Sequence, residues 1–243
     1  MFLSFEVPIF ILTKNFKYTI LLLQFMVLTK ESDFVEIDYV GRIKDSNKIF
    51  DLTSEALAKK EGIKSIGHHH YGSKVICLGM NNILSAIDKF LINKETGKTY
   101  TLELSPEQAF GKKDPKLMKI FPVDALKKQN INPVPGLQIN ATGLLGTIVN
   151  VAGGRVTIDF NHPLASKHLL YEITINKIVS DDKQKISSLV QSLIGLHDHD
   201  FAVDIESNKA VINSGTKLPK DIKDVFTKKV KAIIPSIDVS FSE

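Results

Sequence analysis

Two groups of histidines are the first candidates for chemistry in this sequence. Three adjacent histidines, His68–His70, occur in "GHHHYG", and His197 and His199 occur in "LHDHD" near the C-terminus. Imidazole nitrogens commonly bind transition metals. Neighbouring residues of an extended strand point to opposite faces, so three consecutive histidines form one site only where their loop curls. We therefore expect no metal site, with a curled loop at His68–His70 as the alternative.

The sequence lacks the short motifs of several common enzyme classes. It contains no G-x-S-x-G, no H-E-x-x-H and no phosphate-binding loop. Its single cysteine, Cys77, excludes an internal disulfide framework and has no surroundings that suggest a nucleophile. We predict that Cys77 is a small core residue, that the protein needs no cofactor, and that it works in a reducing compartment, the cytoplasm.

Composition sets the scale of the fold. The chain has 243 residues, of which 43% are hydrophobic, enough for one large domain or two to three small ones. Its 31 basic and 27 acidic residues give a formal charge of +4 and are mixed along the chain. This pattern predicts no specific nucleic-acid partner.

The first 25 residues form an apolar extension. Glu6, Lys14, Asn15 and Lys17 divide it into runs too short to cross a bilayer core of roughly 30 Å. It lacks the basic start and the small-residue cleavage site of a secretory signal. We expect that Met26 is the functional start and that residues 1–25 are not translated, which leaves no membrane contact. An uncleaved membrane anchor is the alternative.

Hydrophobic periodicity places the elements that follow. Three segments alternate apolar and polar residues as strands do, namely "FVEIDYVGRI", "KTYTLEL" and "LLYEITINKI". Between the first two, "NNILSAIDKFLI" carries apolar residues at helical spacing. These strands are too few for a two-sheet sandwich, so the pattern predicts an α+β fold in which one helix lies across a bent antiparallel sheet.

The order of these segments resembles that of the FKBP-type peptidyl-prolyl cis-trans isomerases, above all the SlyD-like, long archaeal branch. The resemblance covers about residues 26–180 and includes "VEIDYVGRI", the Phe-Asp pair, "ILSAIDKFLINKETGKTYTLELSPEQAFG" and "NHPLA". It implies a bent sheet wrapped on one helix, an isomerase domain formed by residues 26–111 and 161–180, and unfolded or nascent proline-containing polypeptides as partners.

The resemblance also implies a proline pocket. The matching residues are Tyr39, Phe50, Asp51, Ile83, Leu84, Ile87, Phe110 and Tyr171. From the residues alone, Asp51 could instead cap a local turn, and the two tyrosines could fill a sheet face. Three positions depart from the family: Ala86 replaces a usual glycine, Phe110 replaces a frequent tyrosine, and Ile87 replaces an aromatic residue or leucine. A catalytically weak binding or interaction module is therefore the alternative.

Residues 112–160 interrupt the family pattern. They contain a helix candidate beginning near Pro122, three alternating segments and an "AGG" turn. The resemblance implies an insert-in-flap domain that binds unfolded chains. We predict that some apolar side chains of this insert stay exposed and form a chaperone surface. The candidate residues are Leu137, Ile139, Leu144, Leu145, Ile148 and Val149. The alternative is that it packs on the isomerase domain.

Residues 181–243 lie outside the family core. Their pattern predicts an α-β-β-α-β unit, with a first helix that ends at Gly195 and a hairpin around "SN". It resembles the extra C-terminal domain of long archaeal members and contains no active-site motif. We expect partner docking or a homodimer through this domain. A run of lysines from Lys217 to Lys231 is broken by Asp221 and Asp224, which favours a solvated face.

Overall fold

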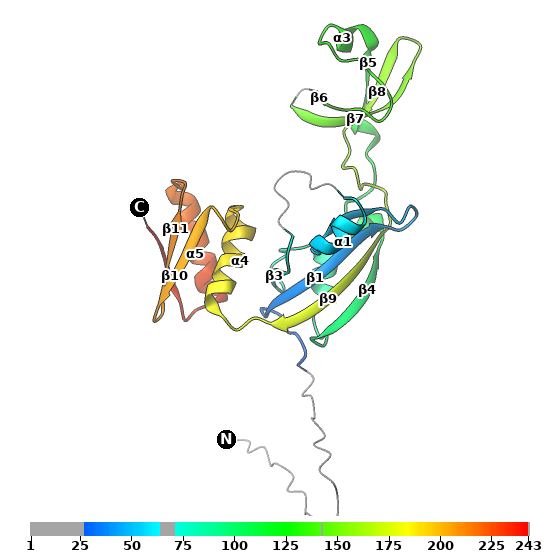
Figure 1. The fold of residues 1–243 in the computed structure, drawn as a ribbon. Coiled ribbons are helices and arrows are strands. Elements are labelled where there is room, and N and C mark those ends of the chain that lie inside the picture. The colour runs from blue at the N-terminus through cyan, green and yellow to red at the C-terminus, as the bar shows by residue number, and fades with distance from the viewer. Residues whose placement is uncertain (1–26, 64–70, 142, 243) are drawn as a thin grey trace, which may run out of the picture.

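The computed structural model describes residues 27–63, 71–141 and 143–242. Within these ranges the chain has an α+β fold with three sheets (Figure 1). The expectations for residues 1–25 and for His68–His70 fall outside the described residues.

The first sheet is antiparallel and has the order β2-β1-β9-β4, with β3 on the same edge of β1 as β2. Its strands are β1 (Phe34–Ile43), β2 (Ile49–Leu52), β3 (Lys74–Cys77), β4 (Lys98–Leu104) and β9 (Leu169–Ile178). The three strands predicted by alternation are confirmed as β1, β4 and β9. On β1, Val35, Ile37 and Tyr39 are buried, while Glu36 and Asp38 are partly exposed.

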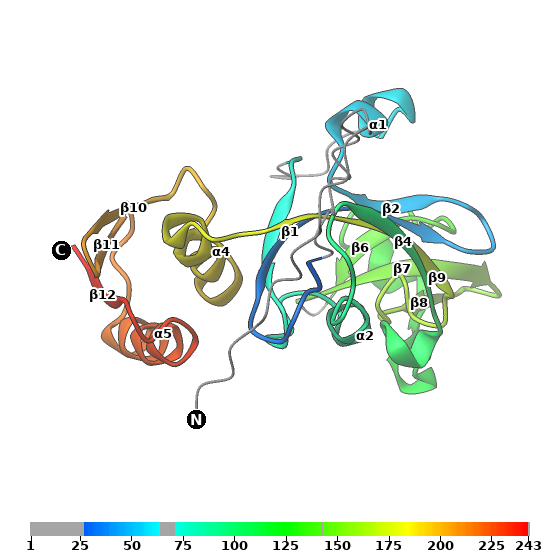
Figure 2. The same cartoon turned by 90° about the horizontal axis from the view of Figure 1, so that it is seen from below.

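Helix α2 (Ser85–Phe90) packs on one face of this sheet (Figure 2). Ile87 and the following Leu91 are fully buried against Ile37 and Ile173. The helix is shorter than its apolar spacing predicts, because Asn81 has a positive φ and Leu84 has a non-helical ψ of 129°. The Asp88 carboxylate accepts hydrogen bonds from the backbone N–H groups of Gly79 and Asn81 in the preceding turn.

A further short helix, α1 (Glu55–Lys60), was not predicted. Ser54 caps it by accepting a hydrogen bond from the Leu57 N–H.

The insert forms a second sheet with the order β5-β8-β7-β6. Its elements are β5 (Met118–Pro122), α3 (Val123–Lys127), β6 (Gln138–Ala141), β7 (Leu144–Ala152) and β8 (Arg155–Asp159). The predicted helix begins just after Pro122, and β5 is an additional strand. Gly153 and Gly154 both have positive φ, as a two-residue hairpin turn between β7 and β8 requires.

The C-terminal unit has the predicted element order. It consists of α4 (Asp182–Ile194), β10 (Phe201–Glu206), β11 (Lys209–Ser214), α5 (Lys220–Ile233) and β12 (Asp238–Phe241). Asp181 caps α4 at its start, and Gly195 ends it in a left-handed conformation. Strand β12 pairs with β11 in parallel.

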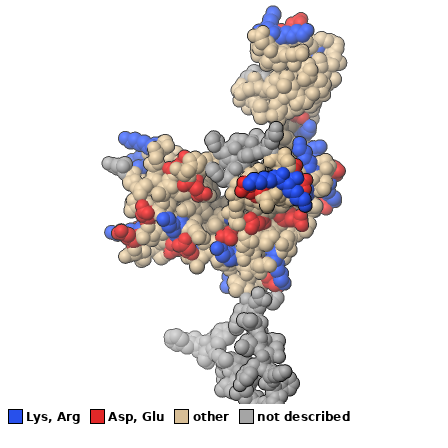
Figure 3. All heavy atoms as spheres, viewed as in Figure 1, with Lys and Arg blue, Asp and Glu red and all other residues tan. Residues whose placement is uncertain are grey.

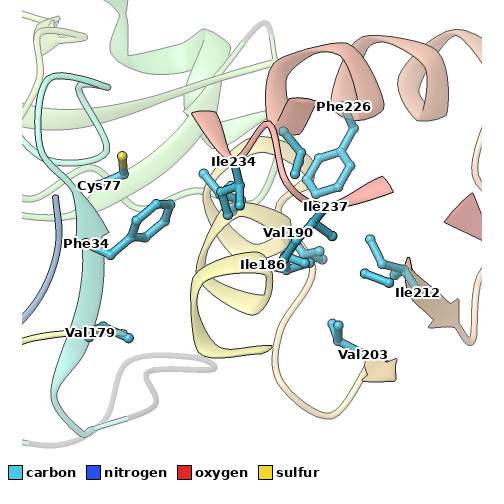
Figure 4. Packing of buried hydrophobic residues seen from close by; sticks show 13 residues of the cluster. Phe34, Cys77, Val179, Ile186, Val190, Val203, Ile212, Phe226, Ile234 and Ile237 are labelled. Carbon is cyan, nitrogen blue, oxygen red and sulfur yellow. The ribbon is translucent and has the colours of Figure 1, made fainter. Parts of the chain in front are cut away.

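The core of this unit is continuous with one side of the first sheet. Phe34, Cys77 and Val179 are buried together with Ile186, Phe226 and their neighbours (Figure 4). The prediction that Cys77 is a core residue is thereby confirmed. An apolar hollow also lies between α4 and α5, lined in part by Leu193, Ile222 and Val225. The homodimer predicted for this unit stays a prediction.

Candidate functional site

The centre of the candidate site is a hydrogen-bonded pair between neighbouring strands. The Tyr39 hydroxyl of β1 donates to Asp51 Oδ2 of β2 at 2.9 Å. The other oxygen of this carboxylate, Oδ1, is buried and has no hydrogen-bond partner among the described residues. Burial, reinforced by the Asp51 charge, raises the pKa of both Tyr39 and Tyr171 above its usual value. Both phenols are therefore neutral hydrogen-bond donors at physiological pH.

Two further aromatic rings adjoin this pair. The Tyr171 ring lies 6.1 Å from the Tyr39 ring and 5.6 Å from the Phe50 ring, which meets it edge to face. Gly41 makes this approach feasible, because a Cβ there would come within 2.7 Å of the Phe50 ring.

A β-bulge explains how two consecutive residues reach the same place. Gly41 pairs with Asp51 and Arg42 pairs with Ile49, so Phe50 is the extra residue on β2. Neighbours on a regular strand would point to opposite faces, and a bulge re-aims one of them. Phe50 and Asp51 therefore both contact the tyrosine pair, Tyr39 and Tyr171: the Phe50 ring meets Tyr171, and the Asp51 carboxylate accepts from Tyr39.

The segment after β4 adds a stacked pair of rings. Phe110 follows a 3-10 turn (Pro106–Gln108), and its ring lies parallel to that of His162 at a centroid distance of 4.2 Å. The His162 Nδ1 accepts a hydrogen bond from the Leu164 N–H at 3.2 Å, which leaves Nε2 as the protonated nitrogen of the neutral ring. His162 was not among the predicted site residues, although it lies in the "NHPLA" segment.

Aliphatic residues from the α2 region complete the constellation. Ile87 is fully buried, whereas Ile83 and Leu84, which precede the helix, are half-buried and pack against the same core cluster as Phe50 and Phe110. The structure thus places all eight predicted residues in or against one cluster. Phe50, Ile83, Leu84 and Phe110 are half-buried at this cluster, Tyr39, Ile87 and Tyr171 are buried in it, and the Asp51 carboxylate is bonded to Tyr39.

Comparison with known proteins gives a family model and several relatives. A family model described as the IF domain of FKBP26 matches residues 119–164. The probable FKBP-type 16 kDa peptidyl-prolyl cis-trans isomerase of Pseudomonas fluorescens is 34% identical over 103 residues, which cover 40% of this chain and 67% of the relative. The chain belongs to the FKBP-type peptidyl-prolyl cis-trans isomerases.

Two other members of this family match longer stretches. The short-type peptidyl-prolyl cis-trans isomerase of Methanocaldococcus jannaschii is 28% identical over 151 residues, 62% of this chain and 94% of the relative. The isomerase SlyD of Treponema pallidum is 26% identical over 161 residues, 64% of this chain and 81% of the relative. The resemblance drawn from the sequence is therefore confirmed.

The insert presents a second candidate surface. Register and burial place Met118, Ile120 and Leu145 on the face of its sheet opposite its core, and all three are exposed, as is Val149 at a β-bulge of β7. Most of the insert is uncharged on the side shown in Figure 3, where charged groups gather at its tip. Figure 1 shows its sheet standing away from the first sheet, so the alternative of packing on the isomerase domain is not what the structure shows.

The set of residues predicted for this surface needs one correction. Ile139 and Ile148 lie in the core of the insert with Leu126, Val156 and Ile158. They point inward because the small sheet needs a buried face of its own to fold. Leu137, Leu144, Leu145 and Val149 are exposed as predicted, whereas Met118 and Ile120 were missed because β5 was not predicted.

Two features are absent from the described residues. They contain no group of three or more His, Cys, Asp or Glu side chains placed to hold a metal ion. No helix among them is long and apolar enough to span a membrane. His197 and His199 lie near each other in the C-terminal unit with their rings stacked.

Proposed function

We propose that the protein catalyses the cis-trans isomerisation of peptidyl-prolyl bonds. Its proline site is lined by Tyr39, Phe50, Asp51, Ile83, Leu84, Ile87, Phe110 and Tyr171, and the first sheet curves over α2 as in the family. The observation that carries the proposal is the Tyr39–Asp51 pair enclosed by Phe50 and Tyr171 in a member of this family.

The chemistry follows from the nature of the amide. Resonance keeps the X-Pro bond planar with a rotation barrier of about 18–20 kcal/mol, and the twisted transition state loses the dipole of the planar amide. A dry apolar site favours the less dipolar twisted state, and contacts to flanking residues hold the twist. A thousandfold acceleration requires only about 4 kcal/mol, so no nucleophile, metal or cofactor is needed.

Paired substitutions test this function. Phe50→Ala and Asp51→Ala should each lower kcat/KM for a proline-containing tetrapeptide by about tenfold or more, about 1.4 kcal/mol. Phe90→Ala is the matched control, because Phe90 is also a half-buried aromatic residue of this core but contacts Tyr100 instead. Unchanged rates in both site variants would refute the site, and a wild-type protein without activity would favour the binding module.

We also propose that residues 112–160 bind unfolded chains. The support is the exposed apolar face of the insert, together with the match of residues 119–164 to an IF domain. Large apolar side chains gathered on one exposed face of a small folded unit favour a binding role. In this proposal, residues 26–111 and 161–180 form the isomerase domain, and residues 181–243 form a C-terminal domain.

The chaperone test uses exposed residues so that the fold is preserved. Ile120→Ser combined with Leu145→Ser should weaken suppression of the aggregation of a denatured protein and leave tetrapeptide rates unchanged. Val225→Ser is the control, because Val225 is 55% exposed, close to the 64% of Ile120 and the 63% of Leu145, but lies on α5. If Val225→Ser weakened the suppression of aggregation as much as the double variant does, the result would contradict a specific role for the insert.

A further inference from the structure

Lys74 has an unusual position at the edge of the candidate site. On β3, Ile76 and the following Leu78 belong to the core cluster beneath the site, whereas Val75 and Cys77 pack towards the C-terminal unit. Side chains alternate along a strand, so Lys74 shares the face of Ile76. A lysine thus begins a strand face that is otherwise apolar.

The Lys74 ammonium contacts the central tyrosine directly. Its Nζ donates to the Tyr39 hydroxyl at 3.0 Å and lies 5.5 Å from the centre of the Tyr39 ring. That hydroxyl in turn donates to Asp51. An ammonium has three N–H donors, and this contact uses one of them. Among the described residues, no carboxylate forms an ion pair with Lys74.

The two charged groups at this edge are not equally accessible. Asp51 is half-buried, with one oxygen bonded to Tyr39 and the other closed to solvent. Lys74 is exposed. A peptide approaching the rings therefore meets the positive group, while the negative group lies behind the Tyr39 hydroxyl.

We propose that Lys74 is a specificity-determining residue that selects peptides with an acidic side chain next to the proline. The proposal rests on the isomerase function proposed above. Desolvation by a bound peptide strengthens the attraction between the ammonium and a carboxylate, although exposure keeps it modest. Selection then acts through charge, and the apolar rim binds the proline itself.

A purely structural role for Lys74 predicts a different result. If the ammonium only held the Tyr39 ring in place, its removal would lower the rates for acidic, neutral and basic peptides by the same factor. If it selects the substrate, its removal changes the ratio between them. The ratio is therefore the decisive measurement.

The experiment compares tetrapeptides that carry Glu, Gln or Lys immediately before or after the proline. For wild type we expect kcat/KM to be about fivefold higher for the Glu peptide than for the Gln peptide at one of the two positions, and this ratio should fall in high salt. Lys74→Met should bring the ratio close to one, Lys74→Arg should keep it, and Lys74→Glu should favour the Lys peptide.

A second lysine over aromatic rings provides the matched control. Lys94 Nζ lies 4.5 Å from the centre of the Phe90 ring, away from the tyrosine pair, so Lys94→Met should leave the ratio as in wild type. Equal wild-type rates for Glu and Gln peptides at both positions would overturn the proposal while leaving the isomerase function intact. Absence of activity on every peptide would instead refute the isomerase function. An unchanged ratio in Lys74→Met would also overturn the proposal.

Discussion

The insert and the C-terminal unit are attached to the first sheet in contrasting ways. The insert has a separate hydrophobic core, and polar contacts join the two segments that lead to it: Lys113 forms an ion pair with Asp159 at 2.7 Å, and Asp114 and Asn161 exchange hydrogen bonds. The C-terminal unit shares one apolar core with β1, β3 and Val179, the residue that follows β9. The insert should therefore behave as a removable module, and the C-terminal unit as part of the fold.

Deletion of each region gives the largest expected difference. Ending the chain at Ser180 would expose Phe34, Cys77 and Val179, which are at most 4% exposed in the structure, so this variant should aggregate or fail to fold. Replacing residues 112–160 by a short Gly-Ser loop should leave tetrapeptide isomerisation largely intact, because the flanking segments are held together by the bond from Ser166 N–H to the Gly111 carbonyl.

Circular dichroism, size-exclusion chromatography and a refolding assay check these two variants. The insert deletion should still reduce catalysis of proline-limited refolding, because capture by the insert raises the local concentration of client prolines. A folded, active chain that ends at Ser180 would contradict the shared core. Parallel loss of refolding and tetrapeptide activity in the insert deletion would show that the insert is a structural part of the active site.

Single core substitutions should show the same contrast with smaller effects. Phe226→Ala and Ile148→Ala remove side chains that are 2% and 0% exposed, and such truncations typically cost about 3–5 and about 2–5 kcal/mol. Phe226→Ala should lower the main unfolding transition of the isomerase domain. Ile148→Ala should affect only the insert. Calorimetry combined with tetrapeptide activity distinguishes them, and a joint shift of all transitions in Ile148→Ala would refute the independence of the insert.

Sequence periodicity predicted the long elements but missed some of the short ones. Strands β1 and β9 each have ten residues, enough for alternation to emerge. Strand β3 has four residues, and helix α1 has six with Ala58 as its one buried residue, so neither shows a period. Helix α2 starts later than its apolar spacing predicts because Asn81 and Leu84 have non-helical backbone angles, which the spacing of side chains does not reveal.

The candidate site shows the same limit. The family pattern supplied Tyr39, Phe50, Asp51 and Tyr171, but the bulge that lets Phe50 and Asp51 both reach the tyrosines is a property of strand pairing and leaves no local pattern. Lys74 and His162 are far from their partners in the chain, 35 and 52 residues away. Such contacts depend on register, and alternation alone does not set the register between strands.

The thiol of Cys77 offers the finest test of the shared core, because it needs no substitution. Cys77 lies at the junction of β3 and the C-terminal unit, and burial, followed by the charges of Asp88 and Asp33, raises its pKa to about 11. The closed state then holds almost no thiolate at pH 8, and labelling requires the unit to open. In the open state the thiol has its ordinary pKa. The labelling rate should therefore rise about tenfold, equivalent to about 1.4 kcal/mol, between pH 7 and pH 8.

Phe226→Ala should speed the labelling of Cys77, and Ile148→Ala should not. Rapid labelling of the wild-type protein, at the rate of the denatured chain, would show that the C-terminal unit does not cover this face of β3.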